Sequence, residues 1–510
     1  NLKQLDKIIE KIRAEKIESV AICFLHSFIN PAHEELVGRV VKESLPDCFV
    51  SLSTNILPQK REYERTSTTV INAYVGPPVR DYLGEMIQQL TTKGITERLM
   101  VMQSSGGILD AKSCLEKPAH IVECGPAAGV VGAEYIARAA GFKNVLTLDM
   151  GGTTAKASII EGGSFSLADE YEVGGGMSSS SALVGKGGYA LKLPVIDIAE
   201  VGAGGGSLAW LDGAGSLKIG PESAGANPGP ACYSQGNENP TVTDANLVLG
   251  YLNPEALAAG TVPINKKLAE QAIQKYIAKP MKLDLMETAY GIHSVANAAM
   301  MRAVRAVTTY RGRDPRDFTL FAFGGAGGLH AVDLARVLRI KEVVVPVAAG
   351  VFSAVGLLYS NLEVNEMAPL LTLIESVPLD IAERAYGNLE NKITKIIGGD
   401  KSEIEFTRFA DVRFRGQAYE ITVSFENNNE LTNEEFDKLA DRFEKQHLDR
   451  YGHAFSGEFP VELVNLRLVG TKKRKTSAIK QNTEKLEKMV NSRQVYFGPN
   501  IGSTNARVIT

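Results

Sequence analysis

The sequence predicts an α/β protein of several domains, with an additional α+β domain near its end. Three stretches carry this prediction. Residues 1–140 alternate helix-like and strand-like patterns, as in a layered α/β structure. Residues 143–173 consist of short strand patterns separated by glycine turns, which indicates an antiparallel meander. Residues 318–347 run from strand through glycine turn and helix to a second strand, which is a βαβ unit.

Short apolar runs give the expected strands of the first 140 residues. A helix rich in lysine and glutamate precedes the first strand. Pro31 is expected to open a second helix, because proline suits the first turn of a helix. The predicted strands are Ser19–Leu25, Phe49–Leu52 and Leu99–Met102.

The clearest helix of the chain lies between the meander and the βαβ unit. Apolar residues recur at helical spacing over residues 286–311, and Gly312 and Pro315 supply stop signals. The strands expected on either side are Asn144–Leu148, Ala155–Ile160, Ser164–Val173, Phe318–Phe323 and Lys341–Val347, with a further helix over Leu329–Leu338.

From about residue 361 a new series of helix and strand patterns begins, which indicates a separate α+β domain. Its expected elements are a helix over 380–397, a strand hairpin over 405–424, a charged helix over 432–448 and a strand over 461–470. The basic run Lys472–Lys475 then opens a polar segment. A solvated linker is strongly favoured there over a nucleic-acid contact.

Composition narrows the class of protein. The 510 residues are 44% hydrophobic and 22% charged, which at ~100–200 residues per domain suggests three or four globular domains. The 55 basic and 59 acidic residues leave a net charge of -4, which does not favour a nucleic-acid partner. We find no signal peptide and no apolar run of ~18–20 residues, so we expect no membrane association and a cytoplasmic location.

The five cysteines are scattered, odd in number and without CxxC spacing. We expect reduced thiols of a cytosolic protein and no zinc site. The chain starts at Asn1 without an initiator methionine and stops soon after a strand-like run near Tyr496. We therefore expect a fragment of a longer protein, whether natural or cut.

The segment Asp149-Met150-Gly151-Gly152-Thr153-Thr154 lies between two expected strands. A tight Gly-Gly turn lets backbone N–H groups point at an anion without an intervening side chain. Thr153 and Thr154 add hydroxyl donors, and Asp149 at the strand end is placed to hold a hydrated Mg²⁺. The alternative is an ordinary hairpin with a polar tip.

A second glycine loop, Gly324-Gly325-Ala326-Gly327-Gly328, stands after a strand and before a helix. Glycines in that place permit close approach by a nucleotide. The loop is not a dinucleotide-binding fingerprint, because His330 stands where a glycine would be needed. A P-loop is not favoured either, since Lys186 follows Gly185 but lacks the upstream glycine and the following hydroxyl residue.

A third region, residues 197–246, is dense in glycine and proline with acidic residues between them. Such rigid loops indicate parts of a site, and we expect Glu200, Gly204-Gly205 and Asp244 to contribute. Cys232 could act as a nucleophile, but no base is visible near it in the sequence. A packed thiol is favoured.

Together these motifs resemble those of known ATP-binding proteins. A strand–DxGGTT–strand hairpin with a later GGxGG before a helix is similar to the phosphate and adenosine motifs of actin, sugar kinases and the Hsp70 ATPase. From about residue 15 to 470 the chain resembles the hydantoinase A / 5-oxoprolinase / acetone carboxylase family. The strings that carry the family resemblance are Arg61–Thr69, Ser105–Gly107, Gly125–Gly129, Glu200–Ser207 and Ser223–Tyr233.

The resemblance implies an actin/Hsp70/sugar-kinase-like ATPase fold with ribonuclease H-like lobes and an additional α+β domain. Residues 1–140 would then complete the first lobe with a connecting α/β segment, and 141–360 would form the ATPase lobe. Residues 361–471 would form the α+β domain, and 472–510 a linker with the start of a truncated C-terminal segment.

The resemblance also implies ATP and Mg²⁺ as cofactors, in a cleft between the lobes. Asp149 would organise Mg²⁺, and Asp149, Glu200 and Asp244 would be the catalytic carboxylates. The cofactor-binding residues would be Gly151, Gly152, Thr153, Thr154, Lys156, Gly204, Gly205, Gly324, Gly325, Gly327 and Gly328.

Members of this family activate an amide, lactam or ketone by ATP-dependent phosphorylation of its oxygen. We expect a hydrolase subunit that opens cyclic amides of the hydantoin or 5-oxoproline type. The alternatives are a subunit of a ketone carboxylase of the acetone or acetophenone type and, from another class, a non-catalytic nucleotide-binding switch. The resemblance further implies a hydantoinase B-type partner subunit and an oligomer.

The sequence departs from the family in two ways. The family carries an additional DxGGT-type hairpin near its natural N-terminus, and none precedes Asp149 here. Many hairpins of the superfamily also place an aspartate where Lys156 stands. That lysine either pairs with a phosphate or extends into solvent, and it puts in doubt any mechanism that requires a carboxylate there.

Overall fold

The computed structural model describes residues 2–168, 171–174, 188–257, 260–426, 431–455, 457–474 and 490–509. Gly185 and Lys186, which were compared with a P-loop, and Lys475 at the end of the basic run lie outside the described residues. The chain forms two compact units, each built from segments that are distant in the sequence. Unit 1 consists of Asn1–Cys124, Ala190–Pro194 and Ser360–Lys475, and unit 2 of Gly125–Tyr189, Val195–Tyr359 and Thr476–Thr510.

The described strands of unit 2 include a six-stranded sheet in the order β12-β6-β5-β17-β18, with β7 beside β6. β5 and β6 are antiparallel, as the expected meander requires, while β17 runs parallel to both β5 and β18. The strands are β5 (Val145–Met150), β6 (Ala155–Glu161), β7 (Ser164–Phe165), β12 (Ile198–Val201), β17 (Thr319–Phe323) and β18 (Val343–Val344).

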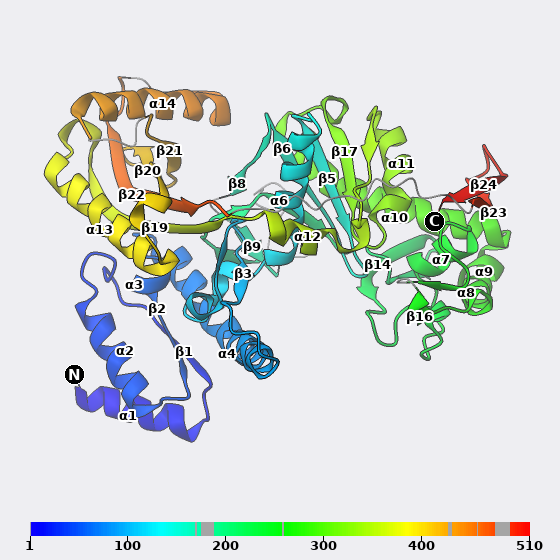
Figure 1. Cartoon of the computed structure of the whole chain (residues 1–510), viewed down its shortest axis with the longest axis horizontal. Helices are drawn as coiled ribbons and strands as arrows, with labels where there is room; N and C mark the ends of the chain where they lie inside the picture. Colours follow the sequence, from blue (N-terminus) through cyan, green and yellow to red (C-terminus); the bar gives the residue numbers. More distant parts are fainter. Residues whose placement is uncertain are drawn as a thin grey trace. The chain divides into compact units, whose positions relative to one another are not determined.

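Alternation of side chains along these strands directs the helices to the two faces of the sheet. Leu148 and Leu320 belong to the core that also contains apolar residues of α7, α10 and α11. Phe323, on the opposite face, contacts the ring of Phe352. These helices are α6 (Cys124–Ala139), α7 (Val242–Val248), α10 (Leu285–Val307), α11 (Gly327–Leu338) and α12 (Phe352–Tyr359) (Figure 1).

Smaller elements complete unit 2. The β23–β24 hairpin packs on it through Tyr496, whose N–H donates to the carbonyl oxygen of Leu249 at 2.9 Å. These elements are β8 (Leu167–Ala168), β9 (Tyr171–Val173), β11 (Val195–Ile196), β13 (Ser207–Leu211), β14 (Leu217–Ser223), β15 (Ala256–Leu257), β16 (Val262–Pro263), α8 (Lys266–Ile273), α9 (Lys279–Met281), β23 (Val490–Tyr496) and β24 (Ser503–Ile509). The short strand β10 (Tyr189–Leu191) spans the change from unit 2 to unit 1.

Unit 1 contains a six-stranded sheet in the order β21-β20-β22-β19-β4-β3 among its described residues. Its core is formed by the sheet and the helices α13 and α14, with Tyr386 and Phe443 among the fully buried side chains. The elements are β3 (Met100–Met102), β4 (Ile108–Asp110), β19 (Leu362–Leu373), α13 (Leu379–Ile397), β20 (Glu405–Phe414), β21 (Ile421–Ser424), α14 (Asn433–Tyr451) and β22 (Val461–Lys472).

The first part of unit 1 is a small α/β layer. β1 and β2 pair in parallel, and Pro31 precedes the helix between them, as the sequence predicts. The 31-residue helix α4 packs against both strands and contains Pro77 and Pro78 in its interior. The elements are α1 (Leu2–Ala14), β1 (Ser19–Ile22), α2 (Ala32–Ser44), β2 (Phe49–Leu52), α3 (Ser53–Ile56), α4 (Glu62–Thr92) and α5 (Ala111–Cys114).

The grouping of segments differs from the division expected from the sequence. Residues 1–140 and 361–471 were expected apart, whereas both contribute strands to the sheet of unit 1. The link is β19, which pairs with β22 along its length and with β4 at Leu362 and Ile108. The sequence pattern does not reveal β19, because Asn365 and Pro369 are residues that strands disfavour.

The expected strand Ser164–Val173 is also different. Its described residues form β7, β8 and β9, and residues 169–170 lie outside the description. Within the described ranges, none of the helices combines the length and the apolarity needed to cross a bilayer.

The contact between α6 and α12 gives a first prediction. A Cβ atom on Gly356 would lie 1.8 Å from the carbonyl oxygen of Ala128, so Gly356→Ala must push the two helices apart. We expect a stability loss of about 1–3 kcal/mol, measured as a lower midpoint of thermal unfolding. The control is Gly387→Ala in α13, where a Cβ meets no atom within 4 Å and alanine is expected to stabilise the helix. Equal shifts in the two variants would contradict this packing.

Candidate functional site

The expected phosphate hairpin is a tight turn between β5 and β6. The N–H of Gly151 donates to the carbonyl oxygen of Thr154 at 3.1 Å, which closes the turn. Gly152 and Thr153 at its tip are exposed, and a Cβ atom on Gly151 or Gly152 would meet no atom within 4 Å. The tip therefore opens into free space.

Hydrogen bonds hold the turn from behind. The carbonyl oxygens of Gly151 and Gly152 accept the N–H groups of Gly205 and Gly206 at 3.0 and 2.6 Å. The N–H groups of Gly152 and Thr153 donate to no acceptor in the part of the chain that the structure describes. Because the carbonyls are occupied and these N–H groups are not, the tip offers donors to an anion.

Gly204 and Gly205 support this hairpin. A Cβ on Gly204 would lie 2.5 Å from the carbonyl carbon of Thr153, so only glycine permits the approach. The N–H of Gly204 donates to Ser207 Oγ at 2.8 Å, and that of Gly205 to the hairpin. We expected Gly204 and Gly205 to bind the cofactor directly; their N–H groups are instead used within the protein.

The glycine loop at 324–328 follows β17 and lies beside the hairpin. The parallel register sets Phe323 opposite Asp149, so the chain turns at the next residue. Gly324 has φ +81°, and a Cβ on it would lie 2.4 Å from Asp149 Oδ1. The N–H of Ala326 donates to the carbonyl oxygen of Met150 at 3.0 Å, and α11 begins at Gly327. The two expected loops therefore meet at one edge of the sheet, next to Asp149.

Asp149, Lys156 and Glu200 form a row across three neighbouring strands. Lys156 pairs with Asp149 in the β5–β6 register and with Glu200 in the β6–β12 register, so the three side chains share one face. Lys156 Nζ lies 3.2 Å from Glu200 Oε1 and 2.6 Å from Thr154 Oγ1. The side chains of Lys156 and Glu200 are 20% and 21% exposed. Lys156 is therefore held at the hairpin and does not extend freely into solvent.

Asp149 has a partly buried carboxylate with two polar neighbours. Burial raises its pKa above the ordinary value, while the charge of Lys156 and a hydrogen bond from Ser353 act in the opposite direction. Ser353 belongs to α12, about 200 residues after the hairpin, and no local sequence pattern points to it. A cation would relieve the cost of this buried charge.

Asp244, which we expected to be a catalytic carboxylate, makes its described hydrogen bonds inside the protein. It is fully buried, and its oxygens accept hydrogen bonds from the N–H groups of Ala231, Cys232 and Thr241 and from the Thr241 hydroxyl. Together with Thr241 it forms the capping box of α7. With every bond directed inward, we assign Asp244 to holding the 231–241 loop. Cys232 is fully buried there, and burial raises the pKa of its thiol, as expected of a packed cysteine.

A buried polar network behind α11 was not foreseen in the sequence. The rings of His293 and His330 stack with centroids 4.3 Å apart. Asn246 contacts both rings, at 2.8 Å from His293 Nδ1 and 3.1 Å from His330 Nε2. Burial and the neighbouring His293 hold the pKa of His330 well below its usual range. His330 belongs to α11, and its second ring nitrogen, Nδ1, lies 2.6 Å from Asn297 Oδ1 of α10. Both nitrogens of this neutral ring are therefore used inside the protein, where they tie α11 to its neighbours.

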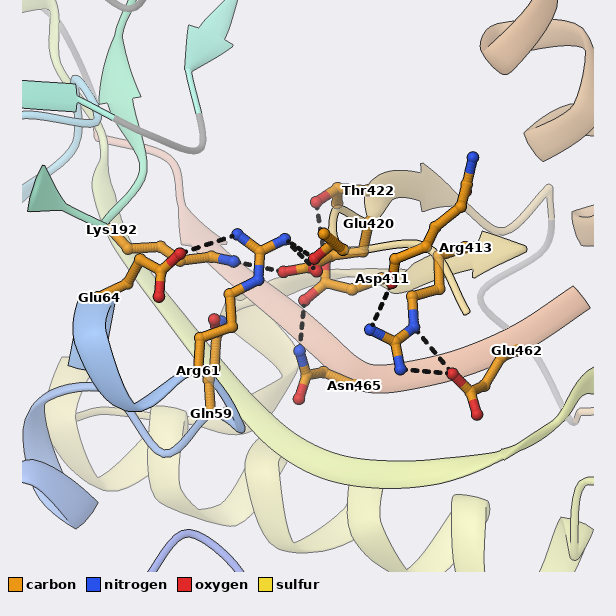
Figure 2. A network of polar contacts seen from close by, with 12 residues as sticks. Gln59, Arg61, Glu64, Lys192, Asp411, Arg413, Glu420, Thr422, Glu462 and Asn465 are labelled. Atoms are coloured by element: carbon orange, nitrogen blue, oxygen red, sulfur yellow. Dashed lines mark hydrogen bonds and ion pairs between the residues drawn. The ribbon is translucent and has the colours of Figure 1, made fainter. Parts of the chain in front are cut away.

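Unit 1 contains a second polar cluster, which includes the start of the family string at Arg61 (Figure 2). Arg61 lies 2.9 Å from Glu420 and 3.4 Å from Glu64. Glu420 also forms an ion pair with Lys192, whose backbone N–H donates to Thr68 Oγ1 at 3.0 Å. The string thus anchors the segment Ala190–Pro194 within unit 1.

The environment of Asp149 gives a prediction on stability. Since the pKa of Asp149 is raised in the folded protein, its ionised form costs stability at neutral pH, and that cost vanishes below the ordinary value of 3.8. Asp149→Asn should therefore raise the midpoint of thermal unfolding at pH 7, and the difference should close as the pH falls to about 4. A difference that is constant over this range would contradict the assignment.

Comparison with known proteins identifies the family to which the sequence is similar. The Hydantoinase/oxoprolinase family model matches residues 65–366, and the model of the Hydantoinase/oxoprolinase N-terminal region matches residues 1–45. An uncharacterized protein of Methanocaldococcus jannaschii is 43% identical over 468 residues, which cover 92% of this chain and 67% of the relative. Caprolactamase subunit alpha of Pseudomonas jessenii is 35% identical over 465 residues, covering 90% of this chain and 64% of the relative.

Among solved structures, a nucleotide-free acetone carboxylase superposes with a TM-score of 0.78 at 25% identity, over 99% of this chain and 72% of that chain. The chain thus spans about two thirds of the length of these relatives. The family match, the superposition and the paired hairpin and glycine loop agree. The chain belongs to the hydantoinase/oxoprolinase family and has its actin-like ATPase fold.

Proposed function

We propose that this chain is the ATP-using part of a hydrolase that opens cyclic amides of the hydantoin or 5-oxoproline type. The observation that carries the proposal is the meeting of three features at one edge of the unit 2 sheet. These are the open turn at Gly151–Thr154, the carboxylate of Asp149 and the glycine loop at 324–328. The family membership of the chain supports the use of ATP.

The residues at this edge fit a nucleotide with a divalent cation. The hairpin tip has free space above Gly151 and Gly152, and the N–H groups of Gly152 and Thr153 have no acceptor among the described residues. Mg²⁺ typically takes one or two carboxylates together with phosphate oxygens, and the carboxylate of Asp149 lies against Gly324 at the start of the second loop. We assign Asp149 to Mg²⁺, and the hairpin and the loop at 324–328 to ATP.

Each side chain then has a defined task. ATP, when bound, would supply a phosphoryl group to the amide oxygen, which makes the carbonyl carbon easier for water to attack before the ring C–N bond breaks. The N–H groups of Gly152 and Thr153 hold phosphate oxygens, and the ammonium group of Lys156 offsets negative charge beside them. Glu200 holds Lys156 in place from the neighbouring strand, which makes Glu200 a positioning residue.

The relatives favour a hydrolase and leave a carboxylase as the second candidate. Caprolactamase, by its name, acts on a lactam, and its alpha subunit is 35% identical to this chain, whereas the acetone carboxylase of the superposition is 25% identical. The superposition on acetone carboxylase supports the second candidate, a ketone carboxylase. A non-catalytic switch is less favoured, because the caprolactamase and acetone carboxylase relatives are, by their names, enzymes. Since the caprolactamase relative is a subunit, we also propose a B-type partner subunit and an oligomer.

The first test is nucleotide binding by calorimetry. Asp149→Ala should weaken binding of ATP in the presence of Mg²⁺ by about 100-fold, the scale of losing a charge-stabilising group at a phosphate site. The control is Asp317→Asn, an exposed carboxylate before the other end of β17, which should bind ATP as the parent does. Unchanged binding by Asp149→Ala would show that the nucleotide is held elsewhere.

The second test separates the roles of Lys156 and Glu200. If Glu200 acts only through Lys156, Glu200→Gln should lower ATP turnover by a smaller factor than Lys156→Met, and the double variant should be no worse than Lys156→Met alone. Turnover would be measured on the complete enzyme with 5-oxoproline, hydantoin and acetone as separate substrates. Additive losses would mean that Glu200 has a catalytic role of its own.

A further inference from the structure

Unit 1 carries buried hydrogen-bonding groups that the nucleotide-binding loops do not use. Glu363, Asn365 and Met367 are alternate residues of β19 and therefore point to the same face of the sheet. Gln59 approaches this face, since its Nε2 lies 2.8 Å from Met367 Sδ. The turn of the family string Ser105–Gly107 lies across the strand here, and a Cβ on Gly107 would be 2.4 Å from Glu363 Cβ.

Two carboxamide oxygens on this face receive no hydrogen bond. Gln59 is 3% exposed, and its Oε1 is buried without a donor among the described residues. Asn365 Oδ1 is likewise buried, and no described residue donates to it. A buried acceptor without a donor costs about 1–3 kcal/mol, so these oxygens mark a place where another molecule donates.

The carboxylate of Glu363 lies next along the same strand. Its main-chain oxygen accepts from Gln103 Nε2 at 2.7 Å, but its carboxylate has no hydrogen bond or ion pair within the described ranges. Burial raises its pKa to about 7. The carboxyl group can therefore accept a hydrogen bond when ionised and donate one when protonated.

The segment that carries Gln59 is firmly held. The carbonyl oxygen of Gln59 accepts from Arg65 Nη1 at 3.2 Å, and Arg65 is itself 1% exposed. Two residues after Gln59, Arg61 is fixed by Glu420 and by the carbonyl oxygen of Ala418 at 2.5 Å. Figure 2 shows Gln59 and Arg61 extending from the same segment toward this polar network. The carboxamide of Gln59 is thus presented from a rigid support.

We propose that Gln59, Asn365 and Glu363 form a subsite that binds the amide N–H of a lactam or cyclic urea. Amides fit because they bring an N–H donor to the oxygens and a carbonyl that can accept from the carboxamide NH₂ groups. A ketone brings no donor and leaves both oxygens unpaired, so the subsite selects amides over ketones. The choice of ligand rests on the proposed function. The subsite itself rests on the unpaired acceptors and gives the strings at Arg61 and Ser105 a role in substrate recognition.

The test is the affinity of the full chain for 2-pyrrolidinone and for N-methyl-2-pyrrolidinone, titrated by calorimetry without nucleotide. The two lactams differ in the N–H group, and we expect the first to bind about tenfold tighter, the scale of one hydrogen bond to a buried acceptor. Because the lactam has one N–H, at least one of Gln59→Met and Asn365→Leu should lower this ratio, and the double variant should bring it close to one, since both substitutions remove an acceptor and keep the side-chain volume.

The matched control is Asn465→Leu on the neighbouring strand β22. Asn465 already donates to Asp411 Oδ2 at 2.9 Å, so the substitution should lower stability and leave the lactam ratio unchanged. A ratio that Gln59→Met and Asn365→Leu do not alter overturns the proposal. Absence of lactam binding also overturns it, because the oxygens would then be hydrated by ordered water only.

The same variants distinguish this inference from the proposed function. Gln59→Met and Asn365→Leu should bind ATP like the parent, because neither residue belongs to the hairpin or the glycine loop. Amide-dependent ATP turnover with an unaltered preference for the N–H lactam in both variants would refute the subsite and leave the hydrolase proposal standing. Lactam binding with the expected ratio in a chain that binds no ATP would support the subsite and refute the nucleotide assignment.

Discussion

The parallel pairing of β17 with β5 is the constraint on which the candidate nucleotide site depends. Its register places Phe323 opposite Asp149, so the chain must leave the sheet directly against the carboxylate. Gly324 makes this possible, because any side chain there would collide with Asp149 Oδ1 and would also face a positive φ. The hairpin after β5 and the loop after β17 are adjacent for this reason, although about 170 residues separate them in the sequence.

The surrounding structure supports both loops from inside the protein. The loop at 203–207 binds the carbonyl oxygens of the hairpin, which leaves the N–H groups at the tip free of acceptors among the described residues. Ser353 on α12 contacts Asp149, and the stacked pair of His293 and His330 fills the space between α10 and α11. Residues that we do not expect to contact the nucleotide thus determine the positions of the residues that we propose to bind it.

The sequence predicts the parts of this site that are contiguous in the chain. The hairpin and the glycine loop follow from strand patterns that end in glycines, because local turns are determined by nearby residues. The partnership of Lys156 with Glu200 could not be predicted, since it depends on which strand lies beside β6. Asp244 was expected to be catalytic because acidic residues in glycine-rich loops look alike in a sequence, whether they face a ligand or cap a helix.

The fold shows the same contrast between elements that nearby residues determine and elements that depend on pairing with distant strands. Periodicity reveals α10 and α13, whereas β19 is hidden by its polar residues and by Pro369. Pairing with β22 along nearly the whole strand stabilises β19 in spite of its composition. Asn365, one of the residues that hide this strand in the sequence, also belongs to the proposed amide subsite.

We propose that Asp149 and the two loops form one site for ATP with a divalent cation. The most direct measurement is a calorimetric titration of ATP into the parent chain and into Gly324→Val, with and without Mg²⁺. We expect saturable binding to the parent that weakens at least about tenfold without Mg²⁺, and no detectable binding to Gly324→Val, whose side chain displaces Asp149. Binding to Gly324→Val that equals the parent's affinity and Mg²⁺ dependence would contradict this proposal.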